Sequence, residues 1–432
     1  MTGRYKAYPE YKDSDVDWVS QIPAHWNFGQ LSKLFEIKAG GDLKTEYFSP
    51  VLSESHPHPI YTNATDEKAV YGYTSRAFYQ GNSITVSGRG DVGYAIYREQ
   101  PFDAIIRLLI LTPRSNIYSK FFMYFIREVI DFQVESSAIG QLSTNQISPF
   151  KVVFPDFEEQ QKIANFLDHE TAKIDTLIAK QEKLIELLKE KRQAVISHAV
   201  TKGLNPDVPL KDSGVEWLGE VPEHWTFIPN KRLFELTPKK SQVESKKDLS
   251  CSFIPMDKLK QDSLVLDEEK VIASVFDGYT YFENEDILMA KVTPCFENKN
   301  MVVARGMKNG IGFGSSEIYV LRCNEKVIND FMYYRLQEDI FMNIAIAAMT
   351  GAGGLKRVPA HVITSFVLAL PPIEEQLKIV NSLKEKLKIF DVLSVKATGA
   401  IELMKERKTA LISAAVTGKI DVRDWQPQGV QG

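Results

Sequence analysis

A long segment with helical periodicity occurs twice in this chain, and it constrains the fold more than any other feature. The first copy runs from Glu158 to Val200 and the second from Glu374 to Val416. Both ends are 216 residues apart in the two copies, so no residue has been inserted or lost between them. Neither copy contains proline, so each can form one helix of about 65 Å. A length kept this strictly indicates a rigid spacer.

Apolar residues at heptad-like steps mark the expected contact face of each long helix. The expected seam residues are Ile163, Leu167, Ile174, Leu177, Leu184 and Leu188 in the first copy, and Ile379, Leu383, Phe390, Leu393, Met404 and Leu411 in the second. A lone amphipathic helix of this length has nothing to bury its seam against, so the two copies are expected to pair. A pseudo-twofold relation between the halves makes the pairing antiparallel. Two unrelated surface helices, each packed on its own domain, are the alternative.

A shorter motif precedes each long segment. Trp18 and His25-Trp26 recur as Trp217 and His224-Trp225, 199 residues later. The offset then grows from 199 to 216, so the second half carries 17 more residues between its shared ends. The chain therefore consists of a motif, a variable region and a long helix, followed by the same order again.

The variable regions mix strand-like and helix-like runs, which predicts an α/β fold of the α+β kind. Residues 83–87, 104–111, 286–292 and 317–321 are expected to be strands, and 121–132 and 329–346 helical. We expect two globular domains, joined and spaced by an antiparallel coiled coil, with an internal pseudo-twofold repeat. The expected boundaries are 1–157 for the first domain, 158–203 for the first long helix, 204–373 for the second domain, 374–418 for the second long helix, and 419–432 for a tail.

Charge, cysteine content and the N-terminus bound the functional class. The net charge of −4 does not indicate a nucleic-acid partner, although a local basic patch would be sufficient. The three cysteines lack metal-type spacing, and the first ten residues lack the apolar core of a signal peptide. A cytoplasmic protein without a bound metal is expected.

The sequence Gly88-Arg89-Gly90-Asp91-Val92-Gly93 fits the G-x-G-x-x-G pattern of dinucleotide-binding proteins. That motif needs a following helix, whose N-terminus receives the pyrophosphate, whereas residues 94–97 have the character of a strand. A loop between two strands is the better interpretation. Arg89 could then clamp a phosphate or read a guanine edge, or the loop could be a plain hairpin turn.

No catalytic constellation is evident in the sequence. The two His-Trp pairs have no nucleophile or acidic partner recurring at fixed spacing beside them, so they are expected to be packed structural residues. His56-Pro57-His58 could ligate a metal, but no third ligand is nearby and only one half has it. No phosphate-binding loop of the G-x-x-x-x-G-K-[ST] type occurs. We therefore expect no catalytic residue and no metal ligand.

Loop residues with cationic and amide side chains are candidates for DNA contact, because basic residues bind phosphates while Asn, Gln and Arg read base edges. The candidates are Ser87, Arg89, Gln141, Thr144 and Asn145 in the first half, and Lys291, Lys299, Asn300, Lys356 and Arg357 in the second. An ordinary solvated surface is the alternative for each of them.

The repeated motifs together resemble the specificity subunit of type I restriction–modification systems. They are Trp-x₄-Pro-x-His-Trp from Trp18 and Trp217, Pro-x-x-Glu-Glu-Gln-x-Lys-Ile from Pro155 and Pro371, and Ile-Ser-x-Ala-Val-Thr from Ile196 and Ile412. With the long segments they cover nearly half of the chain. The resemblance implies two target-recognition domains, each reading one half of a split double-stranded DNA sequence, with the coiled coil setting the half-site separation.

The resemblance also implies partners. These are two copies of an S-adenosylmethionine-dependent adenine methyltransferase and a motor-nuclease subunit, which use S-adenosylmethionine, ATP and Mg while this chain binds no cofactor. A coiled-coil adaptor that binds only protein and a stand-alone enzyme acting on DNA are the alternatives.

Overall fold

The chain forms two compact units. The computed structural model describes residues 5–16, 18–64, 66, 69–132 and 141–427. The first unit contains residues 1–182 and 398–432, and the second contains residues 183–397. Both unit boundaries fall inside a long helix, so each unit holds one half of each long helix.

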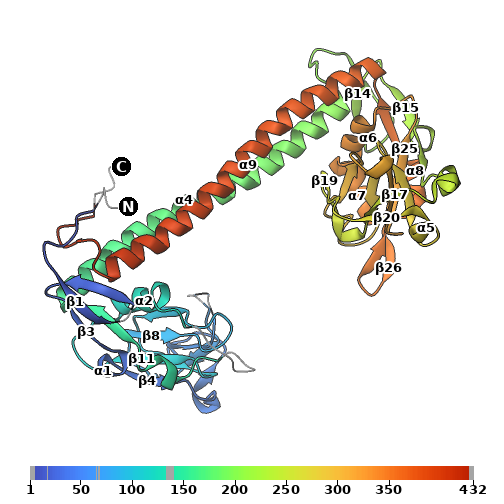
Figure 1. Cartoon of the computed structure of the whole chain (residues 1–432). Helices are drawn as coiled ribbons and strands as arrows, with labels where there is room; N and C mark the ends of the chain where they lie inside the picture. The colour runs from blue at the N-terminus through green and yellow to red at the C-terminus, as the bar shows by residue number, and fades with distance from the viewer. Residues whose placement is uncertain (1–4, 17, 65, 67–68, 133–140, 428–432) are drawn as a thin grey trace. The chain divides into compact units, whose positions relative to one another are not determined.

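The two long helices pack against each other in opposite directions (Figure 1). They are α4 (Phe157–Lys202) and α9 (Ile373–Val416). The hydrophobic core of the first unit joins the start of α4 to the end of α9, and that of the second unit joins the end of α4 to the start of α9. The predicted fold class, with an antiparallel coiled coil and an internal repeat, is confirmed.

Equivalent residues of the two long helices form an ion pair in each unit. In the first unit Lys408 Nζ lies 2.7 Å from an Asp175 carboxylate oxygen. In the second unit Arg192 Nε lies 3.7 Å from Asp391 Oδ1. Lys408 follows Arg192, and Asp391 follows Asp175, by the same 216 residues. Equivalent cations therefore meet equivalent carboxylates in both units.

The seam of the coiled coil differs from the predicted one at three positions. Of the predicted seam residues, Ile163, Leu167, Ile174, Leu188, Ile379, Leu383 and Leu411 are buried, and Phe390 and Met404 are partly buried. Leu177, Leu184 and Leu393 are exposed, so their assignment to the seam was wrong. A seam that alternates steps of four and three runs from Ile174 through Ile178 and Ile185 to Leu188. Leu177 and Leu184 each lie one residue before this seam, about 100° round the helix.

Each unit contains the same four-stranded antiparallel sheet. The strand order is β4-β11-β8-β9 in the first unit and β16-β25-β22-β23 in the second. The strands are β4 (Phe35–Ala39), β8 (Ser83–Val86), β9 (Ala95–Arg98) and β11 (Leu109–Pro113), and β16 (Phe234–Leu236), β22 (Ile287–Ala290), β23 (Met301–Val303) and β25 (Ile318–Cys323). β10 ends at Ala104 and β11 begins only at Leu109, so the predicted strand 104–111 is interrupted. Ile105 forms an isolated bridge with Gly41, and Ile106 and Arg107 form a turn.

A second four-stranded sheet in each unit includes one parallel pair, β10 with β6 and β17 with β24. Its order is β10-β6-β7-β5 in the first unit and β20-β17-β24-β21 in the second. The strands are β5 (Phe48–Ser49), β6 (His58–Tyr61), β7 (Gly72–Thr74) and β10 (Asp103–Ala104), and β17 (Ser250–Ile254), β20 (Glu269–Val271), β21 (Thr280–Glu283) and β24 (Ile311–Gly314).

Two-stranded pairs connect these sheets to the repeated motifs and the long helices. The first unit has β1 (Tyr11–Val16) with β2 (Val19–Pro23) and β3 (Asn27–Gln30) with β12 (Lys151–Phe154). The second has β13 (Leu210–Asp212) with β14 (Glu220–Pro222) and β15 (Thr226–Pro229) with β28 (Val367–Leu370), together with β18 (Leu259–Lys260) with β19 (Ser263–Leu264) and β26 (Thr350–Ala352) with β27 (Leu355–Arg357). The strands that enter the long helices, β12 and β28, therefore pair with the strands that follow the His-Trp motifs.

Short helices complete both units. They are α1 (Leu31–Leu34), α2 (Ser119–Glu128) and α3 (Thr144–Ile147) in the first, and α5 (Ile272–Val275), α6 (Asn329–Leu336), α7 (Asp339–Ala347) and α8 (Ala360–Ser365) in the second. Short 3₁₀ turns occur at Thr45–Tyr47, Asn230–Arg232, Lys240–Lys246, Met256–Lys258 and Lys308–Gly310. The predicted helical stretch 329–346 is thus two helices, α6 and α7.

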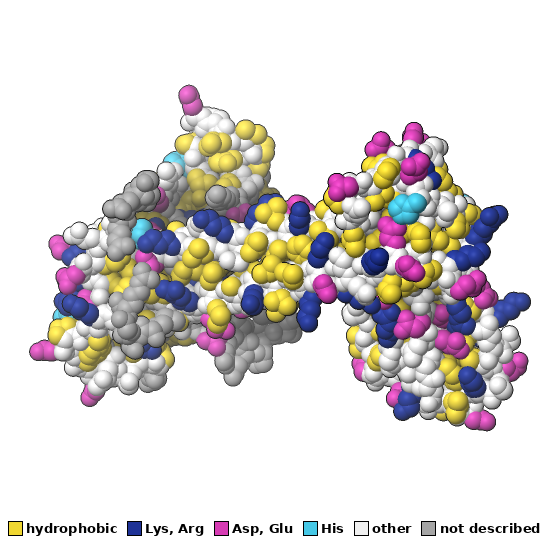
Figure 2. All heavy atoms as spheres, turned by 90° about the horizontal axis from the view of Figure 1, so that it is seen from above, with side chains coloured by type: hydrophobic (Ala, Val, Ile, Leu, Met, Phe, Trp, Pro, Cys, Tyr) yellow, Lys and Arg dark blue, Asp and Glu magenta, His cyan; other side chains and the backbone are white. Residues whose placement is uncertain are grey.

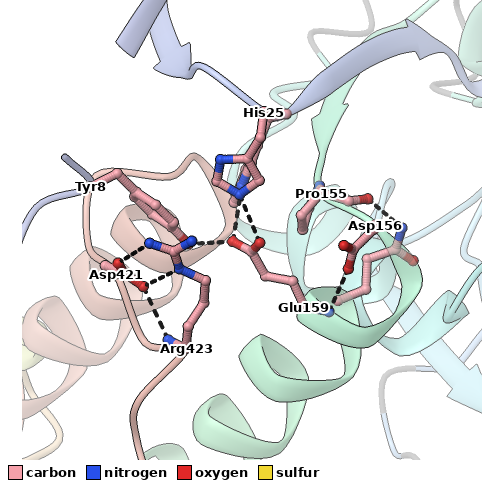
Figure 3. Close-up of polar contacts among 9 residues, drawn as sticks. Tyr8, His25, Pro155, Asp156, Glu159, Asp421 and Arg423 are labelled. Atoms are coloured by element: carbon pink, nitrogen blue, oxygen red, sulfur yellow. Dashed lines mark hydrogen bonds and ion pairs between the residues drawn. The ribbon is translucent and has the colours of Figure 1, made fainter. Parts of the chain in front are cut away.

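A carboxylate at the start of each long helix holds the His-Trp motif, and Figure 3 shows the carboxylate of the first unit, Glu159. Glu159 is buried, and it accepts hydrogen bonds from Trp26 Nε1 at 3.0 Å and from the Tyr8 hydroxyl at 2.7 Å. His25 Nε2 lies 2.8 Å from its other oxygen. Burial and the neighbouring Glu159 raise the pKa of Tyr8 well above its ordinary value, so its hydroxyl stays a donor.

The same anchor occurs in the second unit. Trp225 Nε1 donates to Glu375 at 3.2 Å, and His224 Nε2 lies 2.7 Å from the same carboxylate. Each His-Trp pair thus has an acidic partner, although not at a fixed spacing, because the separations are 134 and 151 residues. It was missed because Glu159 lies 134 residues beyond His25, and the variable region intervenes. The arrangement packs a buried indole against a helix start, as expected of structural residues.

A second pair of contacts fixes the helix starts to α2 and α6. The side-chain oxygen of Gln160 accepts from the Tyr118 amide at 2.9 Å, and that of Gln376 accepts from the Ile328 amide at 2.8 Å. About two helical turns further along α4, Lys120 pairs with Asp168 in the first unit. The equivalent pair in the second unit has reversed charges, because Lys384 pairs with Asp330 at 2.6 Å. The scaffold therefore keeps the contact while its charges have been exchanged.

The corrected seam predicts different consequences for two adjacent leucines. Leu188 is 9% exposed and Leu187 is 48% exposed. Leu188→Ala should lower the free energy of unfolding by about 2–3 kcal/mol through loss of burial and the cavity left behind. Leu187→Ala should change it by less than about 0.5 kcal/mol. Urea unfolding of both variants measures this, and equal losses would contradict the assigned seam.

Candidate nucleic-acid interface

Two loops that are distant in the sequence lie together in the first unit, and we call them the first loop pair. They are residues 87–94, between β8 and β9, and residues 141–147, just before β12. The Leu142 amide donates to the Gly88 carbonyl at 2.9 Å. The guanidinium of Arg89 donates to Gln141 Oε1 from Nε at 3.2 Å and from Nη2 at 2.9 Å. An arginine and a glutamine predicted to contact DNA are thus brought side by side.

A third segment joins the first loop pair through an asparagine side chain. Asn63 Oδ1 accepts from the Gly88 amide at 2.8 Å. Asn63 Nδ2 donates to the carbonyl of Ile106 at 2.7 Å. The exposed Arg107 follows in the same turn. Sequence reasoning missed both Asn63 and Arg107, because no local pattern connects residues 63, 88 and 106.

The second unit carries a comparable pair of segments, which we call the second loop pair. They are residues 291–300, between β22 and β23, and the hairpin 350–357 formed by β26 and β27. Thr293 Oγ1 donates to the Gly354 carbonyl at 2.8 Å, and the Thr293 amide donates to the Lys356 carbonyl at 3.0 Å. The turn of the hairpin is Gly353-Gly354, with φ of 61° and 81°, a conformation that favours glycine. The hairpin strands are exposed, and the hairpin projects from its unit (Figure 1).

Both loop pairs occupy the same place in the repeated fold. In each unit the first member joins the two strands at one end of the sheet order, β8 to β9 or β22 to β23. The second member lies in the segment ahead of β12 or β28, the strand that enters the long helix. Equivalent strands of the two units therefore carry two loop pairs whose sequences differ.

The predicted contact residues of the first unit are placed unequally. Arg89 and Asn145 are exposed, and Gln141 and Thr144 are half-buried. Ser87 is only 2% exposed, and its amide and carbonyl close the turn with Tyr94 and Gly93. The prediction that Ser87 contacts DNA is corrected, because its side chain points into the unit.

In the second unit, Lys356 is exposed on the projecting hairpin. Arg357, on the same strand, forms a bidentate ion pair with Glu317. Its Nε donates to Glu317 Oε2 at 2.9 Å, and its Nη2 donates to Oε1 at 2.8 Å. Lys291 Nζ lies 5.1 Å from the ring centre of Tyr319. The hairpin and the 291–300 loop thus bring Lys291, Lys356 and Arg357 onto joined segments.

Two other predicted residues of the second unit serve local structure. Lys299 Nζ donates to Asp339 Oδ1 and to the Gln337 carbonyl, both at 2.9 Å, so it is tied to the start of α7. Asn300 is half-buried, and its amide donates to the Cys295 carbonyl at 3.0 Å. Lys299 in particular is occupied by this ion pair.

The two loop pairs differ in charge at an equivalent position. Strand pairing aligns β11 with β25 at an offset of 210 residues, which makes Glu317 the counterpart of Arg107. The Arg357 guanidinium, with help from Lys291, holds the pKa of the Glu317 carboxyl below its usual value. The first unit therefore presents an extra cation where the second presents a carboxylate already paired with arginine.

Groups suited to catalysis or metal binding are sparse in the part of the chain that the structure describes. Burial raises the pKa of the Cys251 thiol to about 11 and that of Cys323 to about 12, so neither is a thiolate at neutral pH. Within the described ranges, no group of three or more His, Cys, Asp or Glu residues could hold a metal ion. The glycine-rich loop 88–93 leads into β9, and lacks the helix that a dinucleotide site requires.

Among the described helices, none has both the length and the apolar character needed to cross a membrane.

Comparison with known proteins identifies relatives of this chain. Residues 23–187 match a family described as the type I restriction modification DNA specificity domain. The EcoAI specificity subunit of Escherichia coli is 30% identical over 45% of this chain, which spans only 33% of that relative. The EcoDI specificity subunit of Escherichia coli is 20% identical over 95% of this chain and 92% of its own length.

A solved structure has the same fold. A chain from a study of complex assembly and conformational transition of the type I R-M system superimposes with a TM-score of 0.70 at 10% identity, covering 92% of this chain and 99% of its own length. The resemblance predicted from the repeated motifs is confirmed by these relatives. The curated relatives are named specificity subunits, not catalytic ones.

The paired state of Arg357 can be tested directly. Glu317→Gln should release Arg357 for DNA phosphates, while thermal stability changes little because the ion pair is exposed. The plot of log affinity for DNA against log salt concentration should then steepen by about one unit. Glu297→Gln, an exposed residue of the 291–300 loop, makes the same charge change as a control. An equal steepening in both variants would show that the Glu317–Arg357 pair is irrelevant.

Proposed function

We propose that this relative of the type I restriction–modification specificity subunits is the sequence-specific DNA-recognition subunit of such a system. Each unit reads one half of a bipartite target with its own loop pair. The observation that carries this proposal is the repetition of one framework, with the loop pair at the same place and with different residues in it. A framework kept constant around divergent loops suits two readers of different sequences.

The side chains of the loop pairs suit contact with DNA. Arg89 and Gln141 can form paired hydrogen bonds with base edges, arginine with guanine and glutamine with adenine. Lys356 supplies a cation for the phosphate backbone. The β26–β27 hairpin is a two-stranded ribbon, a shape that the major groove admits. The two loop pairs therefore offer side chains that can read DNA bases and side chains that can bind the phosphate backbone.

The long helices set the separation of the two half-sites. Readers that bind the same side of a duplex must lie about 34 Å apart, or a multiple of this distance. A coiled coil of fixed length maintains such a separation, whereas a flexible linker would not. The equivalent Lys408–Asp175 and Arg192–Asp391 pairs occur at the same register of the helices.

Exposed leucines on the long helices suit two copies of one partner. Leu177 and Leu393 are equivalent residues of the two helices, as are Leu187 and Leu403, and all four are exposed. Figure 2 shows hydrophobic side chains between the cations along these helices. A chain that presents one apolar surface twice would bind two methyltransferase subunits.

Catalysis then belongs to the partner subunits. The methyltransferase subunits use S-adenosylmethionine to modify adenine, and a motor-nuclease subunit uses ATP and Mg to cleave DNA. This chain contributes recognition without a cofactor of its own. Such a complex would act on cytoplasmic DNA.

Methylome sequencing of cells that express this chain with its methyltransferase subunits tests the recognition function. We expect methylated adenines in one bipartite motif with a single spacer length. Several spacer lengths would contradict the role of the long helices. The absence of any sequence preference would favour an adaptor that binds only protein. DNA methylation by the purified chain with S-adenosylmethionine alone would instead identify a stand-alone enzyme.

The stoichiometry of the complex tests the partner surface. Leu177→Asp and Leu393→Asp should each remove one methyltransferase subunit, and the double variant should remove both, because a carboxylate disfavours apolar contact. Native mass spectrometry counts the bound subunits. Val51→Asp, at an exposed residue outside the long helices, provides the control. Retention of both subunits by the double variant would exclude this surface.

A further inference from the structure

A strained turn lies beside the first loop pair, between β10 and β11. Ile106 and Arg107 both have φ of 56°, in the left-handed region. This conformation is unfavourable for residues with a side chain, and most of all for a β-branched residue such as isoleucine. Strain of this kind concentrates at functional sites, where the surrounding structure maintains it.

Backbone contacts hold the turn in this conformation. The Ile106 amide donates to the Gly41 carbonyl and the Arg107 amide to the Gly40 carbonyl, both at 3.1 Å. A side chain at Gly40 would begin only 2.6 Å from the carbonyl oxygen of Ala104, so glycine is required there. The turn is therefore fixed by a close approach between two backbone segments.

The side chain of Ile106 gains little from this conformation within the unit. It is 51% exposed, and Arg107 beside it is also exposed. A structural role would be expected to bury the isoleucine, or to place glycine or asparagine at this position. An apolar side chain that is held outward at the expense of backbone strain indicates contact with another molecule.

The external contact lies next to the candidate base readers. Asn63 joins the Ile106 carbonyl to the Gly88 amide, directly before Arg89. Gly88 also approaches the backbone of Arg107, because a side chain there would begin 3.3 Å from the Arg107 carbonyl oxygen. Ile106 is thus presented beside two cations, Arg89 and Arg107, and the amide of Gln141.

We propose that Ile106 is an apolar base-reading residue, whose side chain packs against a thymine methyl group in the half-site read by the first unit. Contact with that methyl group is how apolar side chains distinguish thymine in the major groove. Arg107 binds the flanking phosphate. This inference rests on the proposed DNA-recognition function, and it adds a residue to the specificity determinants of the first loop pair.

Two substitutions of Ile106 separate recognition from folding. Ile106→Ala and Ile106→Gly should each reduce the preference at one base pair of one half-site by about fivefold or more. The other half-site should be read as before. Ile106→Gly should leave the melting temperature unchanged or raise it, because glycine relieves the left-handed conformation.

The measurement is selection of DNA from a library with randomised half-sites, using the full chain with its methyltransferase subunits. Leu52→Ala is the matched control, since Leu52 is 58% exposed and follows β5, the opposite edge of the sheet from β10. It should leave the base preferences unchanged. Arg107→Gln should weaken binding to all sequences alike and reduce the salt dependence by about one phosphate contact.

The outcomes distinguish this inference from the proposed function. If the unsubstituted complex selects no sequence, the proposed function itself fails. If that complex is selective and the Ile106 variants keep every base preference, only the role of Ile106 is overturned. Uniform weakening at all positions, or a lower melting temperature for Ile106→Gly, would also overturn it, since either result indicates a structural residue.

Discussion

The contact between a carboxylate at the start of each long helix and a His-Trp motif is the interaction on which the rest of the structure depends. Glu159 and Glu375 each hold the indole and the imidazole of a His-Trp motif. A carboxylate removed from water needs such donors, so the contact forms only when the motif and the helix start meet in one geometry. It therefore fixes the direction in which each helix leaves its domain. The glutamine that follows each carboxylate adds a second tie to α2 or α6.

With the helix starts fixed, the framework can tolerate change elsewhere. The Lys120–Asp168 contact of the first unit is an Asp330–Lys384 contact in the second, with the charges reversed. Arg107 of the first loop pair has Glu317 as its counterpart. Substitution at such positions changes what a unit presents to its target without disturbing the sheet beneath. The two halves can therefore share one architecture and differ in the DNA they would read.

The parts of the fold that depend on local periodicity could be predicted from the sequence. The equal length of the two long segments and the absence of proline were sufficient to predict two paired helices. The phase of the seam was less secure, since Leu177 and Leu393 are apolar but lie one residue from it. An alternation of four and three that starts at Ile163 leads to Leu177 and Leu184. The buried face instead takes an additional step of four, from Leu167 to Thr171, and therefore continues through Ile178 and Ile185.

Contacts across long stretches of chain could not be predicted. Asn63 meets Gly88 and Ile106 only because the strands place three loops together, and no spacing rule links these residues. Ser87 was predicted to contact DNA, but it is only 2% exposed in the turn that follows β8. The pairing of Arg357 with Glu317 likewise joins residues 40 positions apart. Loop chemistry is readable from a sequence, whereas the direction of a loop side chain depends on the fold.

The central claim is that each unit reads one half-site independently through its own loop pair. Replacing residues 29–150 with the corresponding region of another specificity subunit tests this claim most directly, because it exchanges the first loop pair and leaves both long helices intact. Methylome sequencing of cells carrying the chimaera should show one half-site changed, with the other half-site and the spacer length retained. A change in both half-sites, or in the spacer, would contradict the claim.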